Sequence, residues 1–445
     1  MPTDTTTAEV TDLLQHLIRN ACVNDGTPAS GHEERSVGVL RDLLTIPGLD
    51  LRMYEPLHGR TSLLARIEGS DPTAPTLLLM GHTDVVPVTP SGWQRDPHGG
   101  ELVDGVVWGR GAVDMLNLTA SMGLATRNLA RSGWKPKGTL LYLAVADEEA
   151  GGVYGAQWLV DNVPGDLKAD YVVTETGGIP VQTAEGPRLW VTVGEKGVCW
   201  TRLIVKGTPG HGSRPFGADN ALVKAAQIVT RLSEHRPTAH VSDIWRQWVA
   251  GMAFEPEVAA ALVDPARISE ALNRLPLTYA KLCHANTHMT IAPTVAHGGT
   301  KTNIIPDRVE LEIDVRTLPG QSSDDLRMVI NDALGELAAD VEMQIIQENK
   351  ASVSSPDTPL WDSLERAALT LAPGARCIPS LTTGGTDARV FREIGIPAYG
   401  FGLFSQRVSY EQFQSMFHGN DERIDQESLR LSVELWEHVA RDLLG

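Results

Sequence analysis

The sequence predicts an α/β protein: a mixed, largely parallel sheet flanked by helices, with a ferredoxin-like α+β domain inserted into the chain. Two observations predict this. In the first half, short apolar runs typical of buried strands alternate with amphipathic helical patterns. Near residue 197 the pattern changes to the order β-α-β-β-α-β, interrupted by a long helical segment. We therefore expect a first domain in two parts, residues 1–196 and 351–445, and an inserted domain at residues 197–350.

Length and composition limit the class of protein. The 445 residues are too many for one compact core and favour two domains. A net charge of −18 opposes binding to nucleic acid or anionic membranes, and no apolar run is long enough to cross a bilayer. The N-terminal residues are polar and lack the basic and apolar parts of a signal peptide, so we expect a cytoplasmic protein with reduced cysteines.

The first domain opens with two amphipathic helices. Between Val10 and Ile18 the apolar residues recur at the spacing of one helical face, and Thr6 with Glu9 forms a capping box at its start. The remaining elements of this part follow from apolar runs and helical periodicity. Helices are predicted at 6–20, 33–44, 118–130 and 155–161, and strands at 63–67, 76–80, 105–111, 140–146 and 171–174.

Three of these apolar strands are followed by side chains that can bind a metal. Gly81 is expected to turn the chain after the strand at 76–80, so that His82 follows at the strand end. Glu148 and Glu149 follow the strand at 140–146, and Glu175 follows the next one. Because the carboxyl ends of parallel strands share one edge of a sheet, we expect these side chains to lie close together.

The rest of the chain completes the inserted domain and then returns to the first. The segment at 236–286 has mixed helical character and contains two tryptophans, and the order β-α-β-β-α-β appears once it is set aside. In the inserted domain, strands are predicted at 200–206, 287–296, 303–316 and 341–347, with helices at 220–232 and 322–338. Beyond it we expect helices at 359–371 and 425–444, a loop at 382–389 and a strand at 398–401.

The candidate ligands combine imidazole with carboxylate, which suits Zn²⁺, with Co²⁺ or Mn²⁺ as alternatives. A single zinc ion needs three or four protein ligands, so this larger set indicates two metals that share one carboxylate and one water. Asp84 is suited to orient the ring of His82, and one of the paired glutamates to act as a base beside a metal-bound water. The full set is His82, Asp84, Asp114, Glu148, Glu149, Glu175 and His418.

Each motif taken alone has an ordinary structural explanation. A single histidine after a strand is commonly structural, Asp-Glu-Glu is usually a solvated turn, and Asp114 could cap the next helix. Gly109-Arg110-Gly111 is not a phosphate loop, which disfavours a nucleotide- or sugar-binding α/β protein. The prediction therefore depends on the joint order and spacing of the residues.

That order resembles the M20 family of metallopeptidases and amidohydrolases, which includes desuccinylases, aminoacylases, acetylornithine deacetylases and glutamate carboxypeptidases. The matching motifs span nearly the whole chain in the family's order. They are Gly-His-Thr-Asp-Val-Val-Pro (81–87), Trp93 with Asp96-Pro97, Trp-Gly-Arg-Gly-Ala-Val-Asp-Met (108–115), Ala-Asp-Glu-Glu-Ala-Gly-Gly (146–152), Glu175, Gly-His-Gly-Ser (210–213), Asn-Ile-Ile-Pro-Asp (303–307), Asp-Val-Arg (314–316), Gly-Gly-Thr-Asp (384–387) and His418-Gly419.

The resemblance implies a role for each ligand. His82 and Glu175 would hold one metal, Glu149 and His418 the other, and Asp114 would bridge the two. The peptide bond after Asp114 is often cis in this family. Leu116 departs from the family, which commonly has a lysine there.

The resemblance also implies the catalytic and substrate-binding residues. Glu148 would be the general base, and His211, on the inserted lid and dimerisation domain, would reach the active site of a partner subunit to stabilise the oxyanion. Asn303 and Arg316 match groups that contact substrate, with the forked donors of Arg316 suited to a carboxylate. An ordinary salt bridge on the strand surface is the alternative for Arg316. The backbone of Gly384, Gly385 and Thr386 would lie near the substrate.

We therefore expect a homodimeric hydrolase with two divalent metals, most simply Zn²⁺. It would cleave an amide or peptide bond next to a free carboxylate in a small N-acyl amino acid or a dipeptide. Glu175, where many aminopeptidase relatives have aspartate, favours carboxypeptidase or acyl-amino-acid substrates. The alternatives are a desuccinylase or deacetylase of a biosynthetic intermediate and a non-catalytic regulatory relative with the same fold.

Overall fold

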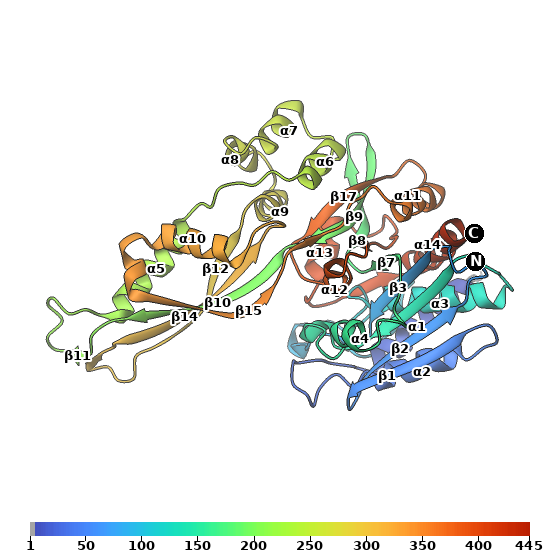
Figure 1. Cartoon of the computed structure of the whole chain (residues 1–445), viewed down its shortest axis with the longest axis horizontal. Helices are drawn as coiled ribbons and strands as arrows, with labels where there is room; N and C mark the ends of the chain where they lie inside the picture. The colour runs from blue at the N-terminus through green and yellow to red at the C-terminus, as the bar shows by residue number, and fades with distance from the viewer. Residues whose placement is uncertain (1–4) are drawn as a thin grey trace.

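The computed structural model describes residues 5–445, and its main body is a helix-flanked sheet with a smaller sheet extending from one end (Figure 1). Within the described residues the main sheet has ten strands in the order β1-β2-β6-β3-β7-β18-β9-β16, with β8 and β17 also paired to β9. The strands are β1 (Asp50–Leu57), β2 (Arg60–Ile67), β3 (Thr76–His82), β6 (Thr139–Val145), β7 (Tyr171–Thr174), β8 (Gly177–Thr183), β9 (Gly186–Glu195), β16 (Ser352–Val353), β17 (Arg376–Thr382) and β18 (Ala398–Gly400).

The centre of the main sheet is parallel and largely apolar. Strand β3 pairs in parallel with both β6 and β7, and β7 pairs in parallel with β18. Every residue of β6 is buried because helices cover both faces. One face carries α1 (Thr5–Arg19), α2 (Glu34–Leu44), α3 (Leu116–Arg131), α11 (Pro359–Leu371) and α14 (Gln426–Leu444), and the other carries α4 (Ala156–Asn162) and α12 (Ala388–Glu393).

A small separate sheet and several short turns complete the main body. Among the described residues this sheet has three strands, β4 (Glu101–Val103), β5 (Val106–Trp108) and β19 (Arg423–Asp425), and it brings the C-terminal part beside the loop that leads to α3. The remaining short elements are η1 (Pro90–Gly92), η2 (Glu148–Ala150) and α13 (Tyr410–Met416).

The second sheet is built between residues 197 and 349 and has the predicted ferredoxin-like order. Among the described residues its four strands lie in the order β12-β14-β10-β15, all antiparallel. The fold class is therefore confirmed. Its elements are β10 (Gly197–Lys206), α5 (Ala221–Glu234), β12 (Thr290–Gly298), β14 (Arg308–Thr317), α10 (Ser323–Leu334), η3 (Gly335–Asp340) and β15 (Val341–Asn349), with β11 (Gly210–His211) and β13 (Ile304–Ile305) paired at its far tip.

The helical segment within the inserted part packs against the main body, although the sequence placed it in the inserted domain. Its helices are α6 (Asp243–Gly251), α7 (Pro256–Leu262), α8 (Ile268–Leu272) and α9 (Leu277–Thr287). Trp245 and Trp248 of α6 lie in the same apolar core as Trp190 of β9 and Ile378 of β17. In Figure 1, α6, α7 and α8 lie at the top of the view and α9 lies to the left of β17 and β9. The segment therefore forms a wall of the main body beside the base of the second sheet.

The end of β3 differs from the sequence prediction in one respect. Gly81 does not turn the chain; it lies within β3, which continues to His82. A Cβ atom at Gly81 would meet the Thr119 hydroxyl of α3 at 2.4 Å, so glycine permits close packing of helix on strand. The same Thr119 hydroxyl donates to the carbonyl of His82 at 2.7 Å and fixes the strand end.

Among residues 5–445, no helix has both the length and the hydrophobicity needed to cross a membrane.

Candidate metal centre and active site

The candidate ligands come together because three neighbouring parallel strands end at the same edge of the main sheet. Strand β3 ends at His82, β6 leads into the turn that carries Glu148 and Glu149, and β7 leads into Glu175. Asp147, just before the paired glutamates, has φ of 70° and sits in the left-handed region. That conformation is uncommon outside glycine and here redirects the chain sharply after the strand.

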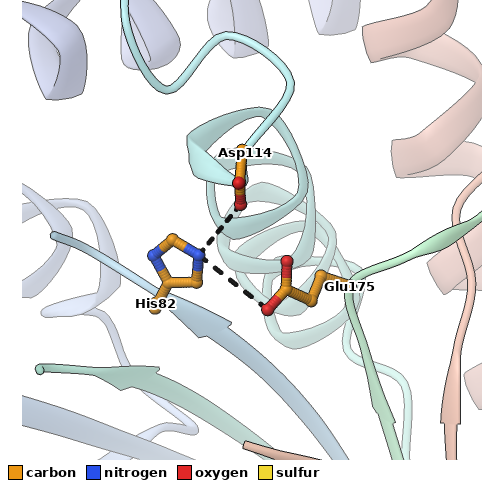
Figure 2. Close-up of side chains that lie close together, drawn as sticks. All are labelled: His82, Asp114 and Glu175. Atoms are coloured by element: carbon orange, nitrogen blue, oxygen red, sulfur yellow. Dashed lines mark hydrogen bonds and ion pairs between the residues drawn. The ribbon is translucent and has the colours of Figure 1, made fainter. Parts of the chain in front are cut away.

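One set of donors is formed by His82, Asp114 and Glu175 (Figure 2). The Nε2 atom of His82 lies 3.3 Å from Asp114 Oδ1 and 4.0 Å from Glu175 Oε1. All three side chains are buried, and their candidate ligand atoms lie within 4.8 Å of one another. Asp114 comes from the loop before α3, and its peptide bond to Met115 is cis, as the resemblance implied.

A second set is formed by Asp114, Glu149 and His418. The Nε2 atom of His418 lies 3.3 Å from Asp114 Oδ2 and 3.4 Å from Glu149 Oε2. Asp114 thus turns one oxygen toward each histidine, the arrangement of a bridging carboxylate. Glu149 Oε1 is buried without a hydrogen-bond partner among the described residues, which is uncommon for a buried polar atom.

Glu148 lies beside the first donor set without belonging to either. Its Oε2 is 4.0 Å from His82 Nε2. Burial, and then the nearby Glu175 carboxylate, raise the pKa of Glu148 well above its ordinary value. A carboxyl group that is close to the donors, buried and shifted toward protonation has the properties of a general acid or base.

Asp84 contacts His82 differently from the sequence-based expectation. The Nδ1 atom of His82 lies 2.9 Å from the backbone carbonyl of Asp84 and 3.6 Å from its carboxylate. The close acceptor for the second ring nitrogen is therefore the backbone, which is a common partner for a metal-binding histidine. The Asp84 carboxylate accepts the backbone N–H of Glu149 at 3.1 Å, so it fixes the turn that carries both glutamates.

Behind Asp84 lies a buried polar network that the sequence did not reveal. Asn24 donates to the Asp84 carboxylate at 2.8 Å and accepts from Arg60 at 3.0 Å. Arg60 in turn donates to Glu33 at 2.7 Å. These residues are at most 2% exposed and come from separate elements of the N-terminal region. No local sequence pattern marks them, because their contacts reach residues 27 to 60 positions away.

Glu422 is a further residue that the sequence did not reveal, and it holds the Asp114 loop. It is fully buried, and its carboxylate accepts the backbone N–H groups of Gly111, Val113 and Asp114 at 2.7 to 3.0 Å. It also accepts from the Arg110 guanidinium at 2.9 Å. Glu422 lies four residues after His418, so it ties the loops of the bridging carboxylate and of a histidine together.

Beside the donors lies a cavity of about 600 Å³ that also receives the predicted substrate-binding residues Arg316, Gly384, Gly385 and Thr386. Arg316 projects from β14 and pairs in a bidentate manner with Asp314 at 2.7 and 3.0 Å. Thr386 is held by Glu195, which accepts its hydroxyl at 2.8 Å. The cavity therefore has contributions from both sheets.

His211 and Asn303 lie elsewhere in the chain. They sit together at the far tip of the second sheet, where the Gly212 N–H donates to the Asn303 carbonyl at 2.8 Å. Both are exposed, and Figure 1 shows β11 at the end of the second sheet farthest from the main body. Within one chain, neither reaches the donor sets.

Comparisons with known proteins show which family the chain belongs to. The chain is 27% identical over 400 residues to the N-fatty-acyl-amino acid synthase/hydrolase PM20D1 of Xenopus tropicalis, covering 87% of this chain and 76% of the relative. It is 26% identical over 416 residues to a succinyl-diaminopimelate desuccinylase of Cereibacter sphaeroides, covering 91% and 92%.

Among solved structures, the M20 family metallo-carboxypeptidase Sso-CP2 of Sulfolobus solfataricus has the same fold. Its TM-score is 0.72 at 19% sequence identity, and the match covers 99% of each chain. The model of "Peptidase family M20/M25/M40" matches residues 78–442, which contain every candidate metal ligand. The chain therefore belongs to the M20/M25/M40 peptidase family and is a hydrolase of the peptidase or aminoacylase type.

Proposed function

We propose that this protein is a two-metal hydrolase that cleaves an amide or peptide bond next to a free carboxylate, in small N-acyl amino acids or dipeptides. One observation carries the proposal: Asp114 faces a histidine on each side, with Glu148 beside the first donor set. Two metal positions beside one uncommitted carboxyl group are an arrangement suited to metal-assisted hydrolysis.

The donor chemistry fits two divalent cations. Each set offers one imidazole and two carboxylates, counting Asp114 in both, which suits Zn²⁺ and also Co²⁺ or Mn²⁺. When bound, the ions supply Lewis-acid polarisation of the carbonyl and lower the pKa of water. The buried, unpartnered Glu149 Oε1 supports the assignment, since a lone pair left unsatisfied in the interior is costly.

Glu148 is the general base of the proposed reaction. It takes a proton from the attacking water and then transfers it to the nitrogen of the leaving amine. Asp84 and the network behind it hold the backbone of the adjacent Glu149 and keep this turn in place.

The substrate carboxylate is proposed to meet Arg316, and the substrate backbone to meet the loop of Gly384, Gly385 and Thr386. All four residues line the cavity that the donors open into. The pairing of Arg316 with Asp314 fixes the plane of the guanidinium. A forked donor held in one plane is well suited to a carboxylate.

His211 and Asn303 are proposed to act in a homodimer. Their place at the tip of the second sheet removes them from the donors of their own chain. A partner subunit would have to bring them to the site, where the His211 imidazole would stabilise the oxyanion.

A desuccinylase or deacetylase activity on a biosynthetic intermediate is the second candidate, and the similarity to a desuccinylase supports it. A non-catalytic regulatory relative would lack the base or one of the ligands. Here Glu148 and both donor sets are present among the described residues, which disfavours that alternative.

The experiment is a hydrolysis screen under controlled metal loading. Purified protein is treated with a chelator, reloaded with Zn²⁺, Co²⁺ or Mn²⁺, and given N-acyl amino acids, N-succinyl amino acids and dipeptides. We expect free amine only from the metal-loaded protein, and little from substrates whose carboxylate is amidated. Metal-independent turnover, or no turnover of any of these substrates, would contradict the proposed function.

A further inference from the structure

The wall of the cavity beyond the donors is apolar, and the proposed chemistry does not use it. Side chains from several separate elements form it: Ile179, Trp190, Leu282, Leu381, Tyr410 and Phe417. Trp190, Leu381 and Tyr410 are each 8% exposed, so they form a packed surface that still faces the cavity. A cavity of this size and lining suits a ligand with a polar head and a large apolar body.

This apolar wall is stiffened by aromatic packing. The ring of Trp190 lies 4.7 Å from that of Tyr410 and 5.5 Å, edge to face, from that of Trp248. Trp248 stacks on Trp245 at 4.9 Å. Interlocked aromatic rings have few alternative conformations, so the wall is a fixed surface of defined shape.

A second, smaller cavity lies behind this wall, and Leu282 stands where the two adjoin. Both cavities are lined by Trp190, Leu282, Ser380 and Leu381. The smaller one is closed on its far side by Trp245 and Trp248 of α6. Leu282 belongs to α9, in the helical segment that packs on the main body. Leu282 is thus one of four side chains that border both cavities, and it is the one that comes from outside the main sheet. The smaller cavity has a volume of about 20 Å³.

We propose that the site takes amide substrates with a large aliphatic or aromatic group, and that Leu282 sets the size limit of that group. The proposal rests on the proposed hydrolase function and adds the substrate class. The group is either the acyl chain or the amino-acid side chain, since both present the same apolar chemistry to the wall. Arg316, which projects into the same cavity from the second sheet, provides the charge for the carboxylate at the other end.

Burial of apolar surface gives the expected size of the effect. Each methylene group removed from water contributes about a threefold to fourfold gain in affinity. If the gain is retained in the transition state, kcat/KM should rise by a similar factor per methylene until the cavity is filled, and then level off.

The test measures kcat/KM in two series of substrates. In one, the amino acid is constant and the acyl chain grows from acetyl to dodecanoyl; in the other, the acyl group is acetyl and the side chain grows from alanine to tryptophan. The variants are Leu282→Trp, which fills the cavity, and Leu282→Ala, which joins it to the cavity behind. Leu277→Trp is the control, because Leu277 opens the same helix, is 69% exposed and lines neither cavity.

In one of the two series, the kcat/KM of the wild type should be at least tenfold higher for its best substrate than for its smallest. The ratio of these two values is the measure that is compared among the variants. Leu282→Trp should lower that ratio at least tenfold, Leu282→Ala should move the optimum to larger groups, and Leu277→Trp should leave the ratio unchanged. A flat dependence on size, or ratios that neither Leu282 variant alters, would overturn this proposal while the hydrolase function stands. No hydrolysis of any substrate would overturn both.

Discussion

At the scale of single residues, the site is dominated by negative charge in a confined space. Carboxylates from four separate segments of the chain surround the buried ring of His82 and the half-exposed ring of His418. Their hydrogen bonds raise the pKa of His418 to about 10, with Asp114 contributing first and Glu149 second. Without a cation, the neighbouring carboxylates therefore favour the protonated form of His418. Metal binding must displace that proton.

Glu422 provides a prediction at this scale. The Glu422→Gln variant places an amide N–H₂ against backbone N–H groups that now donate to a carboxylate, so two like donors face each other. We expect metal affinity to fall by about 10- to 100-fold, the usual cost of disturbing a group that orients a ligand. Competition with a chelating dye measures the affinity.

The matched control for Glu422→Gln is Glu427→Gln, which removes an exposed ion pair with Arg407. It should leave metal affinity unchanged. Equal affinity in Glu422→Gln and the wild type, with both proteins folded, would mean that Glu422 does not hold the Asp114 loop for metal binding.

The convergence of the candidate ligands could be predicted because of where these residues stand in the sequence. His82 and Glu175 follow apolar strands, and parallel strands bring such positions to one edge. Glu422 and Arg60 could not be predicted in the same way. Glu422 acts on backbone groups about 310 residues earlier, and Arg60 reaches Glu33 across two elements. Such contacts exist only once the chain has folded.

At the scale of elements, two apolar strands at the centre of the main sheet were predicted most accurately. Strand β7 matches the predicted bounds, and β6 differs by one residue at each end. Strands β1, β8, β9, β16 and β17 of the main sheet were not predicted. In β8, Gly177, Gly178 and Pro180, and in β17, Pro379, are residues that usually interrupt strands. Both β8 and β17 pair with β9, which keeps them in the sheet although they contain these residues.

The junction of α9 with β12 gives a prediction about pH. The ring of His284 stacks on that of His288 at 4.3 Å, and burial, followed by the charges of His288 and Lys196, lowers the pKa of His284 to about 4. Between about pH 4 and 6.5 the unfolded chain therefore binds more protons at this position than the folded chain. Stability gained from neutral His284 is present above this window and is lost as the pH falls through it.

The measurement is the melting temperature of the wild type and of His284→Gln across this pH window. Because the ring is half-buried, we expect roughly 1 kcal/mol of the pH dependence to disappear in the variant. The control is His16→Gln, which replaces an exposed histidine on α1. Its melting temperature should depend on pH as that of the wild type does. If the melting temperatures of His284→Gln and the wild type changed equally with pH, protonation of His284 would not be coupled to unfolding.

At the scale of the whole molecule, two sheets meet at the cavity while the tip of the second sheet extends away from it. Arg316 comes to the cavity from the second sheet, whereas His211 remains at the tip. The sequence indicated both sheets, but not that the helical segment between them would pack on the main body. That packing includes the contact of Trp248 with Trp190, which lies 58 residues earlier in the chain, and Trp245 stacks on Trp248.

The position of His211 leads to a prediction about the assembly. Subunits of Glu148→Ala and of His211→Ala are each expected to be nearly inactive as homodimers. In a mixed dimer, one site combines an intact Glu148 with an intact His211 from the other chain, so about a quarter of wild-type activity should return at an equal ratio. This fraction follows because half of the dimers are mixed and each has one working site.

Turnover is measured after the two proteins are unfolded and refolded together, with mixed dimers quantified by differently tagged chains. Wild type mixed with Glu148→Ala serves as the reference for exchange. The absence of recovery, with mixed dimers present, would mean that His211 does not act across subunits.

The central claim is that two metals bind between His82 and His418 while Glu148 serves only as the base. The most direct test measures metal content and turnover together for Glu148→Gln and His418→Ala. Glu148→Gln should retain two metals per chain and lose at least about 100-fold in kcat, as expected when a general base is removed. His418→Ala should retain one metal, because its second donor set is incomplete. Substantial turnover by Glu148→Gln, or two metals in His418→Ala, would contradict the account.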